Sequence, residues 1–253
     1  MSNPFTAEPE SVLWLTLISL ILFLAGAVKG VLGFGQPTVA MALLGFMMPP
    51  QRAAALLILP SLVSNTWQIF AGPPVKPAMR RAWPLVVTIG AGTLVGITVI
   101  GTRLGGGATM LLGFVLATYG VVGLTTVRRT IPRTAESWLS PLIGVATGFV
   151  NASTGVSVIP LVPYLQSLEL SKEDLVQTLG ICFLTATLAL GTGLTVTSRV
   201  HLSAADVFLP LLASLAGMRT GQALRRRLAG ETFRRYFLVA LVGTGIYLAI
   251  HAA

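Results

Sequence analysis

The chain has 253 residues, of which 54% are hydrophobic and only 10% charged, and its formal net charge is +9. Soluble domains carry about 25% charged residues, so this composition excludes a soluble protein and predicts an all-α polytopic membrane protein. The charge does not predict a nucleic-acid partner, because the basic residues fall between apolar runs, where the positive-inside rule accounts for them. We therefore expect membrane lipid as the main surroundings.

The first half, residues 1–135, begins with a long apolar stretch that glycines and a proline interrupt. This stretch covers residues 11–48 and contains GAVKGVLGFGQPTVAMALLGF from Gly26 onward. Glycine weakens a helix and proline lacks a backbone donor, so Gly33–Pro37 is predicted to be non-helical. The stretch is too long for one helix, and we predict a broken, re-entrant hairpin. Three transmembrane spans are then expected at residues 53–70, 83–102 and 108–127.

The second half, residues 136–253, repeats this order. A second broken hairpin is predicted at residues 137–168, which contain GVATGFVNASTGVSVIPLVPYL with an interruption at Asn151–Gly155. A shift of about 118 positions superimposes Gly26 on Gly144 and Gly30 on Gly148, and places Lys29 on Thr147. Three further spans are expected at residues 175–197, 204–224 and 236–250.

The basic segments predict how the halves are oriented. A hairpin plus three spans per half inverts the second half relative to the first. With the N-terminus outside, the segments 76–81, 128–133 and 225–235 all lie inside, as the positive-inside rule requires. Four full spans per half in parallel orientation would place one or two of these segments outside. We therefore predict two inverted repeats in the inner membrane, with the N-terminus on the periplasmic side.

Interrupted helices at corresponding places in two halves are typical of a transporter's central binding site. Where a broken helix restarts, its free N–H groups carry a partial positive charge that suits an anion. The alternative roles are helix–helix packing for the GxxxG glycines and hydrogen bonds to the local backbone for the polar side chains. The candidate anion-binding residues are Lys29, Gly33, Phe34, Gly35, Gln36, Thr38, Asn65, Asn151, Ser153, Thr154, Gly155 and Arg219.

Two of these candidates are cations within apolar runs. Lys29 lies deep in the first hairpin, where a charge is costly and points to substrate attraction or gating. Arg219 lies about six residues before a basic segment, roughly 9 Å along a helix. Either side chain could instead extend to the membrane surface, and the sequence leaves both readings open.

The sequence lacks the residues that several kinds of transport and catalysis require. The eight acidic residues lie in termini, loops or span ends, which disfavours cation transport and proton coupling through a carboxylate. The chain has neither a GxxxxGK[ST] nor an HExxH motif, and Cys182 is its only cysteine. We expect no enzyme activity, no metal and no cofactor.

The two interrupted motifs resemble those of the sulfite exporter TauE/SafE family. The first motif, GVLGFGQPTVAMALLGF preceded by Lys29, is a good match, whereas Asn151-Ala152-Ser153-Thr154 stands where the family usually has more glycines. The resemblance covers nearly the whole chain. It implies export of sulfur-containing oxyanions, such as sulfite or organosulfonates, across the bacterial inner membrane.

The sequence thus predicts a secondary transporter, and an exporter, that binds a small anion between the two interruptions. An anion channel of the same fold and a non-transporting membrane scaffold for a sulfur-metabolising enzyme are the alternatives. The substrate, coupling ion, direction and oligomeric state stay open, with a homodimer as one option.

Overall fold

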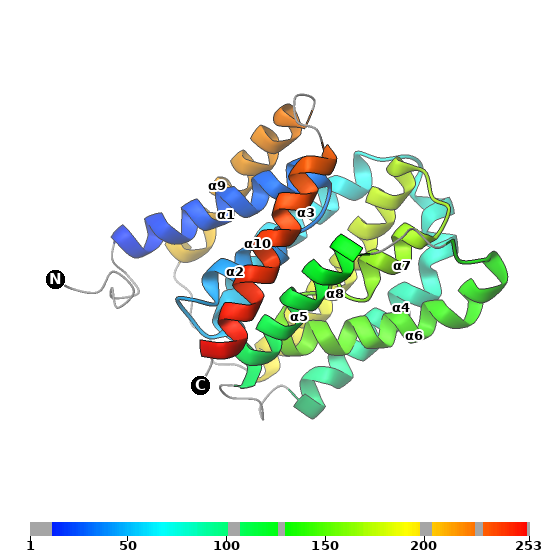
Figure 1. Ribbon diagram of the computed structural model, residues 1–253, viewed down its shortest axis with the longest axis horizontal. Helices are drawn as coiled ribbons and strands as arrows, with labels where there is room; N and C mark the ends of the chain where they lie inside the picture. The colour runs from blue at the N-terminus through cyan, green and yellow to red at the C-terminus, as the bar shows by residue number, and fades with distance from the viewer. Residues whose placement is uncertain (1–11, 101–106, 126–129, 198–203, 226–229, 252–253) are drawn as a thin grey trace.

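The computed structural model describes residues 12–100, 107–125, 130–197, 204–225 and 230–251, and all regular structure in these ranges is helical (Figure 1). These ranges exclude the C-terminal ends of the predicted spans 83–102 and 108–127. They also exclude the arginines at positions 128, 129, 226 and 227. The helices are α1 Val12–Leu32, α2 Gln36–Leu44, α3 Pro50–Phe70, α4 Val75–Ile100, α5 Gly107–Thr125, α6 Arg133–Thr154, α7 Leu161–Ser167, α8 Lys172–Thr197, α9 Ala204–Leu224 and α10 Gly230–His251.

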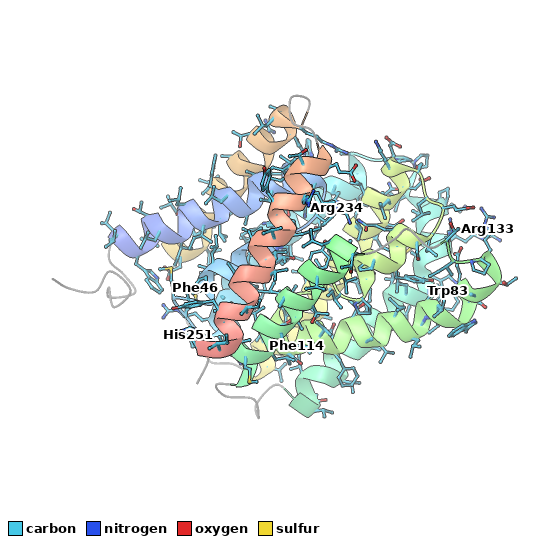
Figure 2. The ribbon with its side chains drawn as sticks, in the orientation of Figure 1. Phe46, Trp83, Phe114, Arg133, Arg234 and His251 are labelled. Atoms are coloured by element: carbon cyan, nitrogen blue, oxygen red, sulfur yellow. The ribbon has the colours of Figure 1, made fainter. Side chains whose placement is uncertain are left out.

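Six of these helices, α1, α3, α4, α5, α8 and α10, are long and apolar enough to cross a membrane. Large apolar side chains such as Trp83 and Phe114 point outward, where a bilayer would cover them (Figure 2). The prediction of an all-α polytopic membrane protein is therefore confirmed. The predicted span 204–224 coincides with α9, which is not among the six apolar helices but packs along α1 over much of its length.

Several helices extend further than predicted, and they carry basic residues that the sequence suggested would lie in loops. Lys76, Arg80 and Arg81 belong to the first turns of α4, and Arg234 and Arg235 belong to α10. Long basic side chains reach the polar membrane surface from a helix end, so a helix can continue past the apolar core without burying them.

Helix pairing is the same when the two halves are exchanged. The first helix of each half packs against the fourth helix of the other, as α1 with α9 and α6 with α4, and these are the two most extensive contacts (Figure 1). The last helices, α5 and α10, pair with each other, and α3 and α8 pair in the centre. This pattern is what two related halves would produce, while their inversion across the membrane stays a prediction.

Glycines form the seam between α1 and α9. A Cβ on Gly26 or Gly30 would meet backbone atoms of α9, and a Cβ on Gly217 or Gly221 would meet backbone atoms of α1. Each helix therefore contributes a small-xxx-small pair, which lets the two backbones come close together.

A matching seam joins α6 to α4. A Cβ on Gly144 or Gly148 of α6 would meet atoms of α4, and a Cβ on Gly92 or Gly96 of α4 would meet atoms of α6. The GxxxG glycines of both hairpins thus pack helix against helix, the packing role that the sequence left open for them.

These seams predict a sharp effect of one added methyl group. A Cβ on Gly148 would lie 2.5 Å from the backbone nitrogen of Thr93, so Gly148→Ala should lower stability by about 1–3 kcal/mol. Gly243→Ala is the matched control, because a Cβ there meets nothing within 4 Å. Thermal unfolding of the purified proteins in detergent measures both. Equal midpoints for the two variants would show that the seam is not tightly packed.

Candidate functional site

The first helix break lies between α1 and α2 and consists of Gly33–Gly35. Gly33 and Gly35 have φ values of 84° and 94°, in the left-handed region that other residues rarely adopt. Gln36 and Pro37, predicted to be non-helical, form the first turn of α2. Proline is tolerated there because first-turn N–H groups have no partner within the helix.

The second helix break lies between α6 and α7 and consists of Gly155–Pro160, starting with Gly155 at φ 69°. The predicted interruption at Asn151–Thr154 is wrong, because these residues form the last turn of α6. This region therefore stays helical four residues further than the glycine-rich first motif suggested.

The hydroxyl groups in the last turn of α6 bond the helix itself. The Ser153 hydroxyl donates to Phe149 O at 2.8 Å and the Thr154 hydroxyl to Val150 O at 2.7 Å. Thr154 Oγ1 also accepts a hydrogen bond from Val156 N at 3.2 Å, just past the helix end. Both hydroxyls, predicted as anion ligands, thus bond the local backbone.

Lys29 is buried at the end of α1, with 3% of its surface exposed. Its Nζ donates to Ser64 Oγ at 2.9 Å and to Asn65 Oδ1, both on α3. Among the described residues it has no carboxylate partner. An ammonium group has three donors, so one remains for a further ligand. A buried charge with only neutral partners is costly by several kcal/mol, which makes an anionic ligand favourable here.

Gln36 extends this arrangement to two more helices. Its Oε1 accepts from Ser64 Oγ at 2.8 Å and its Nε2 donates to Ser214 Oγ of α9 at 2.9 Å. A continuous chain of hydrogen bonds therefore runs from Lys29 through Ser64 and Gln36 to Ser214. Beside it, Thr38 is fully buried, and its hydroxyl has no hydrogen-bond partner in the described part of the chain.

The second break has a neutral polar cluster. Asn151 is 3% exposed, and its Nδ2 donates to Ala186 O at 3.0 Å and more weakly to Thr93 Oγ1 at 3.4 Å. Thr147, the counterpart of Lys29, is fully buried, and no described residue is a hydrogen-bond partner of its hydroxyl. The two breaks therefore share glycines in the left-handed region of backbone conformation but differ in charge.

Two cavities connect the first break with one end of the molecule. The smaller, of about 180 Å³, includes Lys29 and Gly33 in its lining. The larger, of about 1050 Å³, includes Phe34 and Arg234, which lies at the start of α10 (Figure 2). Both are lined by Lys172, Val176 and Arg225, so they adjoin. Basic side chains thus line a path that leads towards Lys29, and the carboxylates Glu173 and Glu231 line it as well.

A match to a known family identifies the class of protein. The model of the sulfite exporter TauE/SafE family matches residues 18–248. The chain belongs to the TauE/SafE family. It is therefore a multi-pass membrane transporter, and the sequence resemblance to this family is confirmed. No curated protein and no solved structure gives a significant match.

The transporter does not bring all predicted site residues together. Lys29, Gln36 and Asn65 belong to one hydrogen-bonded cluster, whereas Arg219 is exposed on α9 and lines none of the cavities described here. An exposed arginine near a helix end fits the alternative in which it extends to the membrane surface.

Sequence reasoning missed the uncharged partners in both clusters. Ser64 and Ser214 complete the chain at the first break, and Thr93 contacts Asn151 at the second. All three lie in other predicted spans, far along the sequence from the breaks. The one available signal was Ser64-Asn65-Thr66, a run of three polar residues within a largely apolar span.

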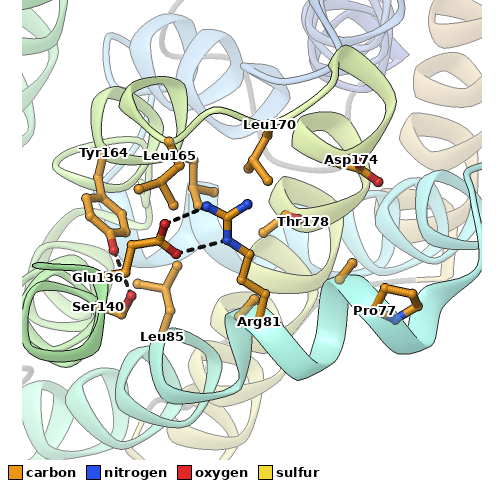
Figure 3. A pocket seen from close by; sticks show the side chains of 13 residues that line it. Pro77, Arg81, Leu85, Glu136, Ser140, Tyr164, Leu165, Leu170, Asp174 and Thr178 are labelled. Atoms are coloured by element: carbon orange, nitrogen blue, oxygen red, sulfur yellow. Dashed lines mark hydrogen bonds and ion pairs between the residues drawn. The ribbon is translucent and has the colours of Figure 1, made fainter. Parts of the chain in front are cut away.

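A separate cavity of about 170 Å³ lies between α4, α6, α7 and α8 (Figure 3). Arg81 of α4 binds Glu136 of α6 through two hydrogen bonds of 2.9 and 2.5 Å. Ser140 and Tyr164 form a hydrogen bond of 2.7 Å that joins α6 to α7. These contacts tie the second hairpin to the helix of the first half against which it packs.

The Arg81–Glu136 pair predicts a measurable coupling. Each of Arg81→Ala and Glu136→Ala should reduce stability, and the double variant should lose about 0.5–1 kcal/mol less than the sum of the two. Thermal unfolding midpoints of the four proteins test this. The control is the same cycle with Arg80→Ala in place of Arg81→Ala, and the effects of Arg80→Ala and Glu136→Ala should be additive. Additivity for Arg81 as well would show that the pair contributes nothing to stability.

Proposed function

We propose that this transporter is a secondary exporter of small sulfur-containing oxyanions, sulfite or organosulfonates, across the inner membrane. The observation that carries the proposal is Lys29, a buried cation whose direct partners are neutral and which lines a cavity beside the basic path. An anion is the ligand that balances such a charge, and the TauE/SafE family supports sulfur oxyanions as the class.

The first break supplies further donors for the oxygens of such an anion. The backbone N–H groups of Gln36 and Thr38 lie in the first turn of α2, where a helix has no internal acceptors and carries partial positive charge. The buried Thr38 hydroxyl lacks a partner among the described residues. We assign the anion to Lys29, Thr38 and the start of α2, with Asn65 and Gln36 holding Lys29 and Ser64 in place.

The second break forms the neutral side of the proposed site. Ser153 and Thr154 already donate their hydroxyl hydrogens to α6, and Asn151 donates its amide to Ala186 O, so these residues offer few donors to an anion. We propose that they shape the site together with Gly155, and that transport moves one hairpin-bearing unit relative to the other helices.

The distribution of basic residues supports an orientation. Arg81, Lys172, Arg225 and Arg234 line cavities that share residues around the α7–α8 connection, such as Leu168 and Leu170. Under the positive-inside rule this end is cytoplasmic, the N-terminus is periplasmic and the repeats are inverted. The basic path would then collect anions from the cytoplasm, as export requires.

Substitution of Lys29 tests the function. In proteoliposomes loaded with radiolabelled sulfite, the native protein should give saturable efflux, and Lys29→Ala should reduce it at least tenfold because the anion loses its counter-charge. Arg219→Ala is the matched control, since it removes an exposed cation from α9 and should leave efflux nearly unchanged. Methanesulfonate loaded in the same way tests the organosulfonate class.

Three results would contradict the proposal. Flux that never saturates with sulfite concentration would favour the anion channel. No sulfite or methanesulfonate flux from folded protein would favour the scaffold. Full activity of Lys29→Ala would remove the site assignment while leaving transport intact.

A further inference from the structure

A small cavity of about 20 Å³ lies between the start of α2 and the second helix break. Pro37 at the start of α2 and Gly155 in the second break line it from opposite hairpins. The volume is close to that of one water-sized particle, since a cavity needs about 10–15 Å³ to hold one. Its remaining lining residues are Ala54, Leu57, Ile58, Ser61, Asn151, Ser157, Phe183, Thr187 and Leu190, none of which is charged.

Side-chain oxygen atoms that accept no hydrogen bond from the described residues gather around this cavity. Ser61 and Ser157 are 2% and 5% exposed, and their hydroxyls make no hydrogen bond within the described ranges. The amide nitrogen of Asn151 is held by Ala186 O, which leaves its Oδ1 as the group available to a ligand. Thr187 donates its hydroxyl to Phe183 O at 2.7 Å and keeps its lone pairs. Buried polar groups normally have a partner, so these point to a ligand.

The surrounding backbone makes the cavity electronegative. The 22-residue helix α6 ends beside it, and the last turn of α6 carries no basic residue to balance its partial negative charge. The residue that α2 contributes is Pro37, which has no N–H to offer. Oxygens therefore outnumber donors, the reverse of the situation around Lys29.

We propose that this cavity binds a single Na⁺ ion, held by Ser61, Asn151, Ser157, Thr187 and carbonyl oxygens of the second break. The C-terminal ends and unwound carbonyls of broken helices coordinate Na⁺ through neutral oxygens, so no membrane-embedded carboxylate is needed. A water molecule fits the volume but leaves the negative end of α6 unbalanced, whereas a cation neutralises it.

The cation site adjoins the anion site through α3. Ser61 lines the cavity, and Ser64 Oγ contacts Ser61 O at 3.3 Å while it also accepts from Lys29 Nζ. This link rests on the anion site proposed above. Na⁺ should support sulfite binding, because a cation near Ser61, one helical turn from Ser64, adds positive potential where the anion is proposed to bind. The coupling is reciprocal, so sulfite should also support Na⁺ binding.

Direct binding tests the cation site without any transport. Purified protein in sodium gluconate should unfold at a higher temperature than in choline gluconate of equal ionic strength, and ²²Na⁺ should bind with a stoichiometry near one. Ser157→Ala and Thr187→Val should each weaken ²²Na⁺ binding at least tenfold. Thr185→Val is the matched control on α8: Thr185 makes the same backbone bond, to Ile181 O, but does not line the cavity, so binding should be unchanged.

Transport measured with equal Na⁺ on both faces then tests the link, because no gradient contributes. Replacing Na⁺ with choline on both faces should slow sulfite efflux at least tenfold, and high Na⁺ should rescue Thr187→Val. If no ²²Na⁺ binds, or if Thr187→Val binds it as well as Thr185→Val, the cation site is wrong even when efflux proceeds. If Na⁺ binds as expected but no sulfite moves, the proposed export fails and the cation site stands.

Discussion

Backbone groups inside a membrane must find partners within the protein, and the transporter's two helix breaks are built around this constraint. At the first break, Gly33 N donates to Lys29 O at 2.7 Å, and the side-chain network from Lys29 to Ser214 holds the restarting helix. At the second break, Thr154 bonds the backbone on both sides of the helix end. Both breaks retain buried oxygens or hydroxyls without partners, and these are the places where ligands can contribute. The protein's own hydrogen bonds therefore hold the breaks in place, and the proposed function uses the polar groups that these bonds leave without a partner.

The glycine seams explain why these breaks stay in place. Each hairpin's long helix lies against the fourth helix of the other half with almost no side chain between the backbones. Close packing of this kind gives many weak contacts and resists sliding, since any larger residue would collide with backbone atoms. The short helices α2 and α7 make far fewer contacts with their neighbours than these seams do. We therefore expect any movement during transport to occur at the breaks and their short helices rather than at the seams.

The fold class and the two interrupted stretches could be predicted, because each leaves a local mark: apolar length, or glycine and proline. Lys29 also carries a local mark, a charge within an apolar run, and the structure buries it, while its role in anion binding stays a prediction. The position of the second break could not be predicted, because the polar residues Asn151–Thr154 look like an interruption in the sequence, whereas in the structure the hydroxyls of Ser153 and Thr154 bond carbonyls of their own helix. The partners Ser64 and Ser214 were also out of reach. They are ordinary small residues within the long helices α3 and α9, and only tertiary packing brings them to Gln36. Arg219 shows the converse, a charge with a clear local mark that the fold leaves on its surface.

The difference between Lys29 and Thr147 follows from placing two related breaks side by side. If both positions carried ammonium groups at a separation on the order of 10 Å, their repulsion would be roughly 1–2 kcal/mol at an effective dielectric constant of about 20, added to the cost of burying each. With one charged and one neutral break, no second permanent charge is buried beside Lys29, and a second cation enters only as the exchangeable Na⁺ proposed above. The neutral break is then free to present oxygens instead of donors. If both proposed sites hold, divergence of the two halves has produced neighbouring sites of opposite charge preference from one repeated helix break.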